Sequence, residues 1–266
     1  LDRVRIDTLP GGGFVRIVSC MQPVVPRDSQ SSDIVPSENW TGDLEVVRNA
    51  RVSYDADWRT GVDDGKDAKL IHRMITHSHS TPFESMAFTF EVQAPIFVFR
   101  QWHRHRTWAY NEISARYALL NLGCYVPNAE LLGKQSATDK QMRDIDETIK
   151  PGHAAYAAVV SIRENYEQAF ARYEKMADEG IPREIARCVL PVNTYSRMFG
   201  TVNLHNLFRF LILRLDEHAQ HEIRVYAEAI VELVQPICPV SMMEFEKMVA
   251  EWKELEKLKD KVHTLK

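Results

Sequence analysis

The segment from Arg104 to Tyr117 carries an unusual density of groups that can bind a ligand. Arg, His, Glu, Asn and Ser side chains alternate there with Trp108, Tyr110 and Tyr117. A core segment is excluded, because each buried charge must be paired or hydrogen-bonded, and a solvated surface does not need the aromatic rings. Guanidinium groups bind phosphate through paired hydrogen bonds and also stack on flat rings. The segment therefore predicts a site for an anionic ligand with a flat heterocycle.

Ser114 could act as a nucleophile or as a phosphate-binding hydroxyl. It follows His105 closely, but the chain has no Gly-x-Ser-x-Gly turn. The cysteines offer no better nucleophile, since only Cys188 has a cation beside it, Arg187, and a small buried thiol is the usual explanation for such a residue. We therefore expect Ser114 to donate a hydrogen bond to a phosphate.

Arg214 is predicted to lie on a long helix that begins after Asn203, a natural N-cap. Spacings of three and four place five residues on one face of this helix: Leu207, Leu211, Arg214, His218 and Glu222. An Arg on an apolar stripe is costly unless it meets an acceptor. A pair with Glu222 or another acid and a contact with a bound ligand are equally compatible with the sequence.

Histidines and glutamates in two places could suggest a metal site. The first place is the loop of residues 77–84, with His77, His79 and Glu84, and the second is the pair His218 and Glu222, near His221. Alternate positions on a loop are weak evidence, and no second helix offers partner ligands. We expect no metal, an intrahelical hydrogen bond between His218 and Glu222, and a polar loop that lines a ligand.

Composition and net charge limit the classes of protein to which the chain can belong. The chain has 266 residues and a formal net charge of −4, which argues against a nucleic-acid partner. Its four cysteines form no Cys-x-x-Cys pair, so a zinc site and a disulfide framework are not indicated. The first residues lack the apolar core of a signal peptide, and no apolar run could span a bilayer. We expect a cytoplasmic protein in a reducing compartment, with no membrane partner.

The elements that must position these residues are mostly helices with a few strands. We predict strands at 14–18, 85–93 and 194–202, the first entered through a flexible Gly-rich turn. Residues 22–43 are expected to form a surface loop or insertion. Helices are predicted at 43–53, 67–77, 95–103, 138–178 with a break at Pro151-Gly152, 182–190, from 204 onward, and 239–266.

The spacing Arg104-His105-Arg106, seven residues, Ser114 resembles the RHR-x7-S signature of the flavin-dependent thymidylate synthases. Four further blocks resemble this family in the same order: residues 79–84, 94–102, 182–187 and 213–222. The resemblance as a whole covers roughly residues 44–235. The resemblance implies one domain over residues 1–266 with an α+β, thymidylate synthase-complementing-like fold, in which a mixed sheet packs with several long helices.

The resemblance also implies a reaction, the conversion of dUMP to dTMP. The expected carbon donor is 5,10-methylenetetrahydrofolate, the reductant NADPH and the hydride carrier FAD, with hydride passing from reduced flavin to C6 of the pyrimidine. Side chains alone cannot supply a hydride, which agrees with a redox cofactor. No Gly-x-Gly-x-x-Gly turn is present, so side chains must hold FAD. A homotetramer with sites shared between subunits is implied as well.

Site residues follow from the resemblance, position by position. The expected dUMP contacts are Gln101, Trp102, His103, Arg104, Glu112, Ile113, Ser114, Ala115, Arg116, Arg187 and Arg214. Arg214 is the expected catalytic residue, because a cation at the uracil ring stabilises negative charge as C5 becomes nucleophilic. The expected FAD contacts are His79, Thr81, Arg104, His105, Arg106, Glu112, Asn203, Leu204, His205 and Arg209. His205 and Arg209 depart from the family pattern, which has Arg and Asn there.

Two other classes of function would explain single features. A metal-dependent hydrolase could use His77, His79, His218 and Glu222, and it would bind a metal and no flavin. A nucleic-acid-binding module could use the basic and aromatic cluster, and it would bind oligonucleotides in a salt-sensitive way. The several matching blocks and the acidic net charge favour the flavin enzyme.

Overall fold

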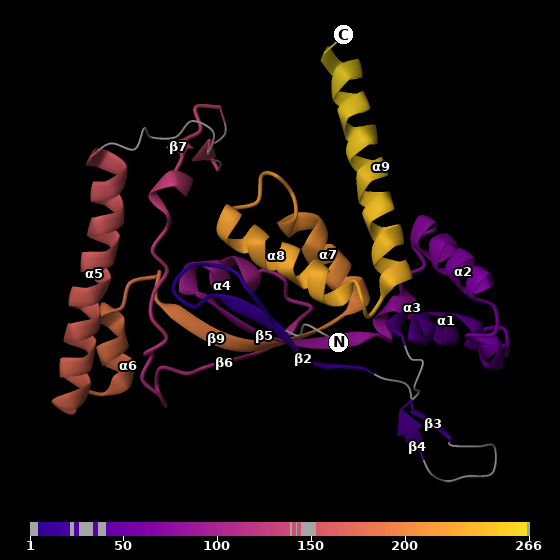
Figure 1. Cartoon of the computed structure of the whole chain (residues 1–266), viewed down its shortest axis with the longest axis horizontal. Coiled ribbons are helices and arrows are strands. Elements are labelled where there is room, and N and C mark those ends of the chain that lie inside the picture. The colour runs from indigo at the N-terminus through magenta and orange to yellow at the C-terminus, as the bar shows by residue number, and fades with distance from the viewer. Residues whose placement is uncertain are drawn as a thin grey trace.

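The centre of the protein is a five-stranded sheet in the order β1-β2-β5-β9-β6 (Figure 1). The structure is a computed structural model that describes residues 5–21, 24–26, 34–36, 41–138, 140–141, 143–144 and 153–264. The strands of the sheet are β1 (Arg5–Asp7), β2 (Phe14–Cys20), β5 (Ala87–Pro95), β6 (Ala109–Glu112) and β9 (Tyr195–Asn203). The helices pack with a sheet whose neighbouring strands are antiparallel, so the α+β class is confirmed. The sheet pairings are all antiparallel, whereas we expected a mixed sheet.

The two central strands position the helices that carry the candidate site. Strand β5 pairs with β9 from Ala87 opposite Asn203 to Pro95 opposite Tyr195. Helix α4 (Ile96–Trp102) follows β5 directly, and helix α7 (Leu204–Arg214) follows β9 directly. Because the strands are antiparallel, the two helices leave the sheet at opposite ends. They lie with α8 (His221–Val234) on the same face of the sheet (Figure 1).

Aromatic side chains hold these three helices together. Trp102 at the end of α4 is fully buried, and its ring centroid lies 4.9 Å from that of Phe210 in α7 and 5.9 Å from that of Tyr226 in α8. Trp108, just before β6, packs edge-on against Trp102 at 5.7 Å. Burial of large aromatic side chains stabilises the packing of such elements. The last turn of α4 is therefore packed firmly against α7 and α8.

A second helical group adjoins one end of the sheet (Figure 1). It contains α1 (Gly42–Val52), η1 (Asp57–Arg59), α2 (Asp64–Thr76), α3 (Thr81–Glu84) and α9 (Pro239–Thr264). The carboxylate of Asp43 in α1 accepts hydrogen bonds from the backbone N–H groups of Val240 and Ser241, at 2.7 and 2.9 Å, and so caps α9. The later turns of α9 extend away from the sheet (Figure 1).

The opposite end of the molecule carries the long helix and two short elements. These are α5 (His153–Asp178), α6 (Arg183–Ala186) and η3 (Arg187–Val189), and η2 (Ala129–Leu131) contacts α5. Helix α5 ends before Gly180, which adopts a φ of +80° that suits glycine. The small strand pairs are β3 (Val24–Pro26) with β4 (Ile34–Pro36), inside the expected insertion, and β7 (Lys134–Gln135) with β8 (Arg143–Asp144).

Most predicted elements are confirmed to within a few residues, but two helices are not. The helix expected from residue 138 begins only at His153, and Arg143–Asp144 within the expected range form strand β8, which pairs with β7. The predicted break at Pro151-Gly152 lies outside the described residues. The helix expected to run from Leu204 through Glu222 ends at Arg214. Asp216 accepts a hydrogen bond from the backbone N–H of His218 at 2.9 Å, so its side chain competes with helical bonding there.

Two further findings concern the chain as a whole. Within the described residues, no helix is both long and apolar enough to cross a membrane. All four cysteines are free, and Cys188 is exposed, contrary to the expectation of a buried thiol.

Candidate active site

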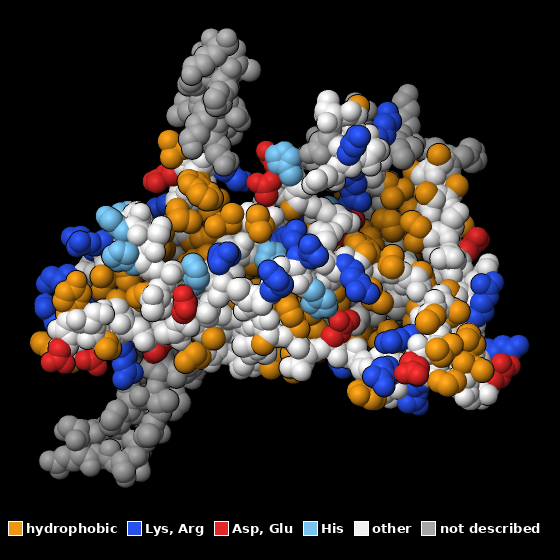
Figure 2. All heavy atoms as spheres, turned by 180° about the vertical axis from the view of Figure 1, so that it is seen from behind, with side chains coloured by type: hydrophobic (Ala, Val, Ile, Leu, Met, Phe, Trp, Pro, Cys, Tyr) orange, Lys and Arg blue, Asp and Glu red, His pale blue; other side chains and the backbone are white. Residues whose placement is uncertain are grey.

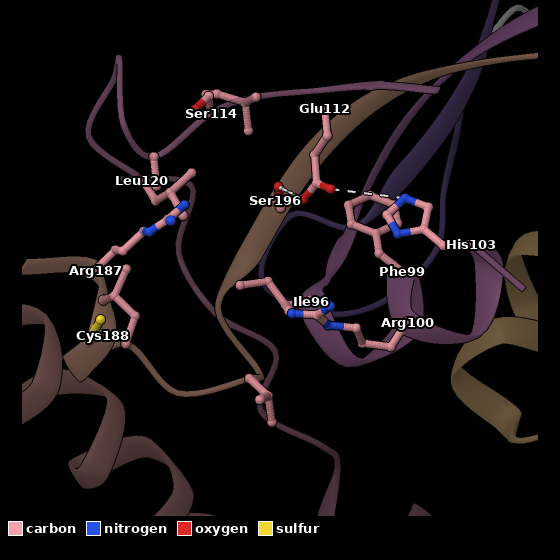
Figure 3. Close-up of a pocket in the computed structure, with 14 residues that line it drawn as sticks. Ile96, Phe99, Arg100, His103, Glu112, Ser114, Leu120, Arg187, Cys188 and Ser196 are labelled. Atoms are coloured by element: carbon pink, nitrogen blue, oxygen red, sulfur yellow. Dashed lines mark hydrogen bonds and ion pairs between the residues drawn. The ribbon is translucent and has the colours of Figure 1, made fainter. Parts of the chain in front are cut away.

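A cavity of about 630 Å³ lies between α4, the end of β6 with the segment that follows it, and η3 (Figure 3). A volume of this size suits a small-molecule ligand. Six residues predicted to bind dUMP line it: His103, Glu112, Ile113, Ser114, Ala115 and Arg187. The rest of the lining consists of Ile96, Phe99, Arg100, Leu120, Cys188, Leu190, Val192 and Ser196. Tertiary structure thus joins the RHR-x7-S segment to the Pro182–Arg187 block.

Cations and hydroxyls dominate the polar wall of this cavity. Arg187 and Arg100 enter it from opposite sides (Figure 3). The hydroxyl oxygen of Ser114 accepts from the backbone N–H of Arg116 at 3.2 Å, which leaves its hydrogen available for a ligand. No base lies within hydrogen-bond distance of this hydroxyl among the described residues, so a binding role fits better than a nucleophilic one.

The single carboxylate in the cavity wall is held in a fixed direction. Ser196 donates its hydroxyl hydrogen to Glu112 Oε1 at 2.5 Å, and Nε2 of His103 lies 3.9 Å from Glu112 Oε2 (Figure 3). An ionised carboxylate only accepts hydrogen bonds. Glu112 therefore suits a ligand hydroxyl or N–H group, while the guanidiniums suit an anion.

Arg214, at the end of α7, is held by neutral groups. Its Nε donates to Nε2 of His105 at 2.9 Å, and its Nη2 donates to the backbone oxygen of Gln101 at 3.1 Å. No carboxylate of the described residues lies within ion-pair distance of it, so the predicted alternative of a pair with Glu222 is wrong. Burial lowers the pKa of Arg214, but a guanidinium stays charged in proteins. Its charge is left for a ligand.

His105 remains neutral beside this cation. Burial, and secondly the charge of Arg214, lower its pKa from 6.5 to about 4. Because Nε2 accepts from Arg214, the proton of the neutral ring resides on Nδ1. One member of the Arg-His-Arg triplet thus positions the residue that we expect at the pyrimidine.

A smaller hollow of about 140 Å³ lies where the end of α2, α3, α7 and α9 meet. Three residues predicted to bind FAD line it: His79, His205 and Arg209. Its other walls are mainly apolar and include Phe83, Ile212 and Phe245. Ser78, also in the lining, adopts a φ of +57°, which turns the loop from α2 into α3. Residues 78–80 of the expected loop thus line a hollow, whereas residues 81–84 form helix α3; the contact of this segment with a ligand stays a prediction.

The other predicted contacts lie outside these two cavities. Trp102 and Leu204 are fully buried in the core, so their side chains reach neither cavity. Arg116 is drawn toward Glu184, with 3.4 Å between Nε and Oε2. Thr81 begins α3, and Asn203 caps α7 by accepting from the backbone N–H of Asn206 at 2.9 Å.

Arg104 and Arg106 are exposed, and neither side chain has a partner in the described part of the chain. Basic and histidine side chains lie close together across the middle of the face in Figure 2. Such a surface suits the phosphates of a nucleotide or dinucleotide ligand.

The expected hydrogen bond between His218 and Glu222 is absent from the structure. His218 Nδ1 instead lies 2.8 Å from Oδ1 of Asp216. Glu222, in α8, pairs with Arg143 at 2.8 Å. Within the described residues, no group of three His, Cys, Asp or Glu side chains could hold a metal ion.

Arg100, Ser196 and Cys188 also lie in the cavity wall, although the sequence predicts no ligand contact for them. Arg100 lies in the block of residues 94–102 that resembles the family. The place of Ser196 in the site depends on strand pairing, because β9 pairs it with Ala94 and brings its hydroxyl to the carboxylate of Glu112.

Fold and site together define an α+β protein with a cavity lined by guanidinium, hydroxyl and carboxylate groups. The family model described as "Thymidylate synthase complementing protein" matches residues 37–240. The chain therefore belongs to the thymidylate synthase complementing protein family, and it is an enzyme of the methyltransferase class.

Curated relatives cover most of the chain. The "Flavin-dependent thymidylate synthase" of Treponema denticola is 42% identical over 205 residues, 77% of this chain and 75% of that protein. The protein of the same name from Thermotoga neapolitana is 40% identical over 197 residues, 74% of this chain and 82% of that protein. The crystal structure of a UMP/dUMP methylase PolB from Streptomyces cacaoi bound with 5-Br dUMP superposes with a TM-score of 0.71 at 34% identity, covering 88% of this chain and 94% of that one.

Proposed function

We propose that this enzyme is a flavin-dependent thymidylate synthase that converts dUMP to dTMP, with FAD as its flavin, 5,10-methylenetetrahydrofolate as carbon donor and NADPH as reductant. The observation that carries the proposal is the environment of Arg214. This partly buried cation has no carboxylate partner among the described residues and donates to two neutral acceptors, so its positive charge is available to a ligand. The names of the relatives support the same reaction.

The larger cavity is proposed to hold dUMP. Arg187 and the Ser114 hydroxyl bind its phosphate, because a guanidinium and a hydroxyl donor together suit an oxyanion. Glu112, held by Ser196, accepts a hydrogen bond from a ligand hydroxyl. The mixed lining, with Phe99 and Leu120 beside the charged groups, suits a molecule with an anionic end and a flat ring.

Arg214 is proposed to face the uracil ring. Its Nε and one Nη2 hydrogen are occupied by His105 and Gln101, so the remaining N–H groups are available to donate to a ligand. These groups stabilise negative charge on the N3/O2 side of the pyrimidine as C5 becomes nucleophilic. A neutral His105 leaves that positive charge undiminished.

The smaller hollow is proposed to hold part of FAD, with His79, His205 and Arg209 in contact with it. When bound, the flavin supplies the hydride that turns the transferred methylene into a methyl group. A hollow of about 140 Å³ is too small for a whole dinucleotide, since ligand pockets usually exceed about 300 Å³. Arg104 and Arg106, which are exposed and have no partner among the described residues, suit the FAD phosphates outside the hollow. Because one subunit does not enclose the whole dinucleotide, the proposed homotetramer with sites shared between subunits is supported.

The decisive experiment combines a spectrum with a product assay. The purified protein should be yellow or take up added FAD, and NADPH should bleach the flavin absorbance in the absence of oxygen. Addition of dUMP and 5,10-methylenetetrahydrofolate should then yield dTMP, and a parallel reaction with UMP measures selectivity for the deoxy sugar. A colourless protein that takes up no FAD and forms no methylated nucleotide would disprove the proposal.

A further inference from the structure

Glu222 lies outside both cavities, yet it is the centre of a buried hydrogen-bond network. Only 2% of this residue is exposed. Its Oε1 accepts from the Tyr125 hydroxyl at 2.9 Å and from Arg143 Nη2 at 2.8 Å, and its Oε2 accepts from Gln220 Nε2 at 2.8 Å. The network joins α8 to the segment before η2 and to β8. A buried acid with three donors has a defined orientation.

The charge of Glu222 decides the direction of the next hydrogen bond. Burial alone would raise its pKa, but the Arg143 guanidinium and the donors Tyr125 and Gln220 bring the pKa below its ordinary value. The group is therefore an ionised carboxylate, which only accepts. Gln220 must turn its NH₂ group toward Glu222.

The fixed amide of Gln220 in turn orients Gln101. With its Nε2 facing Glu222, Gln220 presents Oε1 to the other side, where it accepts a hydrogen bond from Nε2 of Gln101. The two ends of an amide are chemically different, and their placement follows from the partners. The carbonyl Oε1 of Gln101 therefore faces away from Gln220, and it has no partner among the described residues.

Gln101 is also the point where this network meets Arg214. Its backbone oxygen accepts from Arg214 Nη2 at 3.1 Å, and it lies in the last turn of α4, beside the fully buried Trp102. Gln101 thus provides a fixed backbone acceptor for Arg214. The orientation of its side-chain amide is determined by Glu222 through Gln220. Gln101 and Glu222 are 121 positions apart in the chain.

We propose that Glu222 is a positioning residue, which acts through Gln220 to hold the Gln101 amide with its Oε1 toward the nucleotide. The proposal rests on the proposed function for the identity of the ligand, dUMP. The ordinary alternative is that Glu222 only stabilises the fold through its ion pair with Arg143. The two differ in what they predict for Gln220, which is exposed and contributes little to the core.

Gln220→Met tests the relay without touching the buried ion pair. Met has a similar size, but it can neither donate to Glu222 nor accept from Gln101, so the Gln101 amide is no longer held in one orientation. The KM for dUMP should therefore rise about fivefold to tenfold, with little change in kcat. Glu222→Gln should raise KM at least as much, because its amide can donate as well as accept. Gln235→Met, at the other end of α8, is the matched control and should leave KM within about twofold of the starting enzyme.

A double-mutant cycle separates positioning from stability. In the Gln101→Ala enzyme the relay has no end point, so adding Gln220→Met should change the KM for dUMP by less than about twofold. Thermal unfolding of each variant shows whether the fold is kept. Equal effects of Gln220→Met with and without Gln101 would overturn the relay. Failure of the unaltered enzyme to bind dUMP in calorimetry would instead overturn the proposed function, and this inference with it.

Discussion

Arg214 donates its Nε hydrogen to Nε2 of His105 over 2.9 Å, so a cation and a neutral imidazole form a fixed pair. The two residues are 109 positions apart. His105 belongs to the predicted FAD contacts and Arg214 to the predicted dUMP contacts, so this bond connects the two proposed ligands. A carboxylate in the place of His105 would neutralise the guanidinium and weaken its effect on the pyrimidine.

Arg214→Ala should nearly abolish dTMP formation while leaving FAD binding largely intact. The loss in kcat should be about 10²–10³-fold, as for the removal of one preorganised donor at a developing charge. Single-turnover reaction of dUMP with the reduced enzyme measures the chemical step, and the flavin spectrum measures FAD content. Arg214→Lys keeps the charge but cannot bond both His105 and the Gln101 backbone oxygen, so its kcat should lie between those of the starting enzyme and the Ala variant. Normal turnover by the Ala variant would remove Arg214 from the mechanism.

Stability should depend on pH through His105. Its pKa is about 4 in the folded protein and 6.5 ordinarily, so the folded state binds fewer protons between these values. The free energy of unfolding should therefore rise with pH through that window and fall as the pH drops from 6.5 toward 4. His105→Gln removes this contribution, so its pH dependence should be flatter. Urea unfolding at about pH 7, 5.5 and 4.5 provides the comparison. Parallel curves for the two proteins would show that the ring is not buried as a neutral group.

Arg187→Ala should weaken nucleotide binding rather than chemistry. Loss of a charged hydrogen bond to phosphate costs about 1.5–3 kcal/mol, so the KM for dUMP should rise about 10- to 100-fold. Deoxyuridine, which has no phosphate, should bind equally to the variant and the starting enzyme, as calorimetry can show. Arg172→Ala, an exposed Arg of α5 outside the cavity, serves as the control and should change neither value. An unchanged KM in the Arg187 variant would place the phosphate elsewhere.

Asp43→Ala should destabilise the protein through α9. Its carboxylate accepts from the backbone N–H groups of Val240 and Ser241 and from the Ser241 hydroxyl at 2.5 Å. Loss of the cap, with buried donors left unpaired, should cost about 2–4 kcal/mol in the free energy of unfolding. Chemical denaturation measures this cost. Asp43→Asn keeps one acceptor oxygen and should lose less; equal losses would mean that the cap is not the source of the stability.

Local signals in the sequence predicted much of the fold. The sequence predicts that Asn203 caps a helix starting at Leu204, and the structure confirms it, because a cap involves only the next three residues. The strands at 14–18, 85–93 and 194–202 were found by their apolar and β-branched residues, which must face a core. The sequence does not reveal the break after Arg214, because the spacing of three and four continues across it through His218 and Glu222.

The sequence by itself determined the set of chemical groups and the local elements that carry them: the Arg-His-Arg triplet, Ser114 and the cationic end of α7. Tertiary structure alone decided the partners. Arg214 meets His105 and not Glu222, and Glu222 meets Tyr125 and Arg143, since a turn at Asp216 redirects the chain between them. The physical reason is that propensity and capping act over a few neighbouring residues, whereas the choice of a buried charge's partner depends on packing of distant segments.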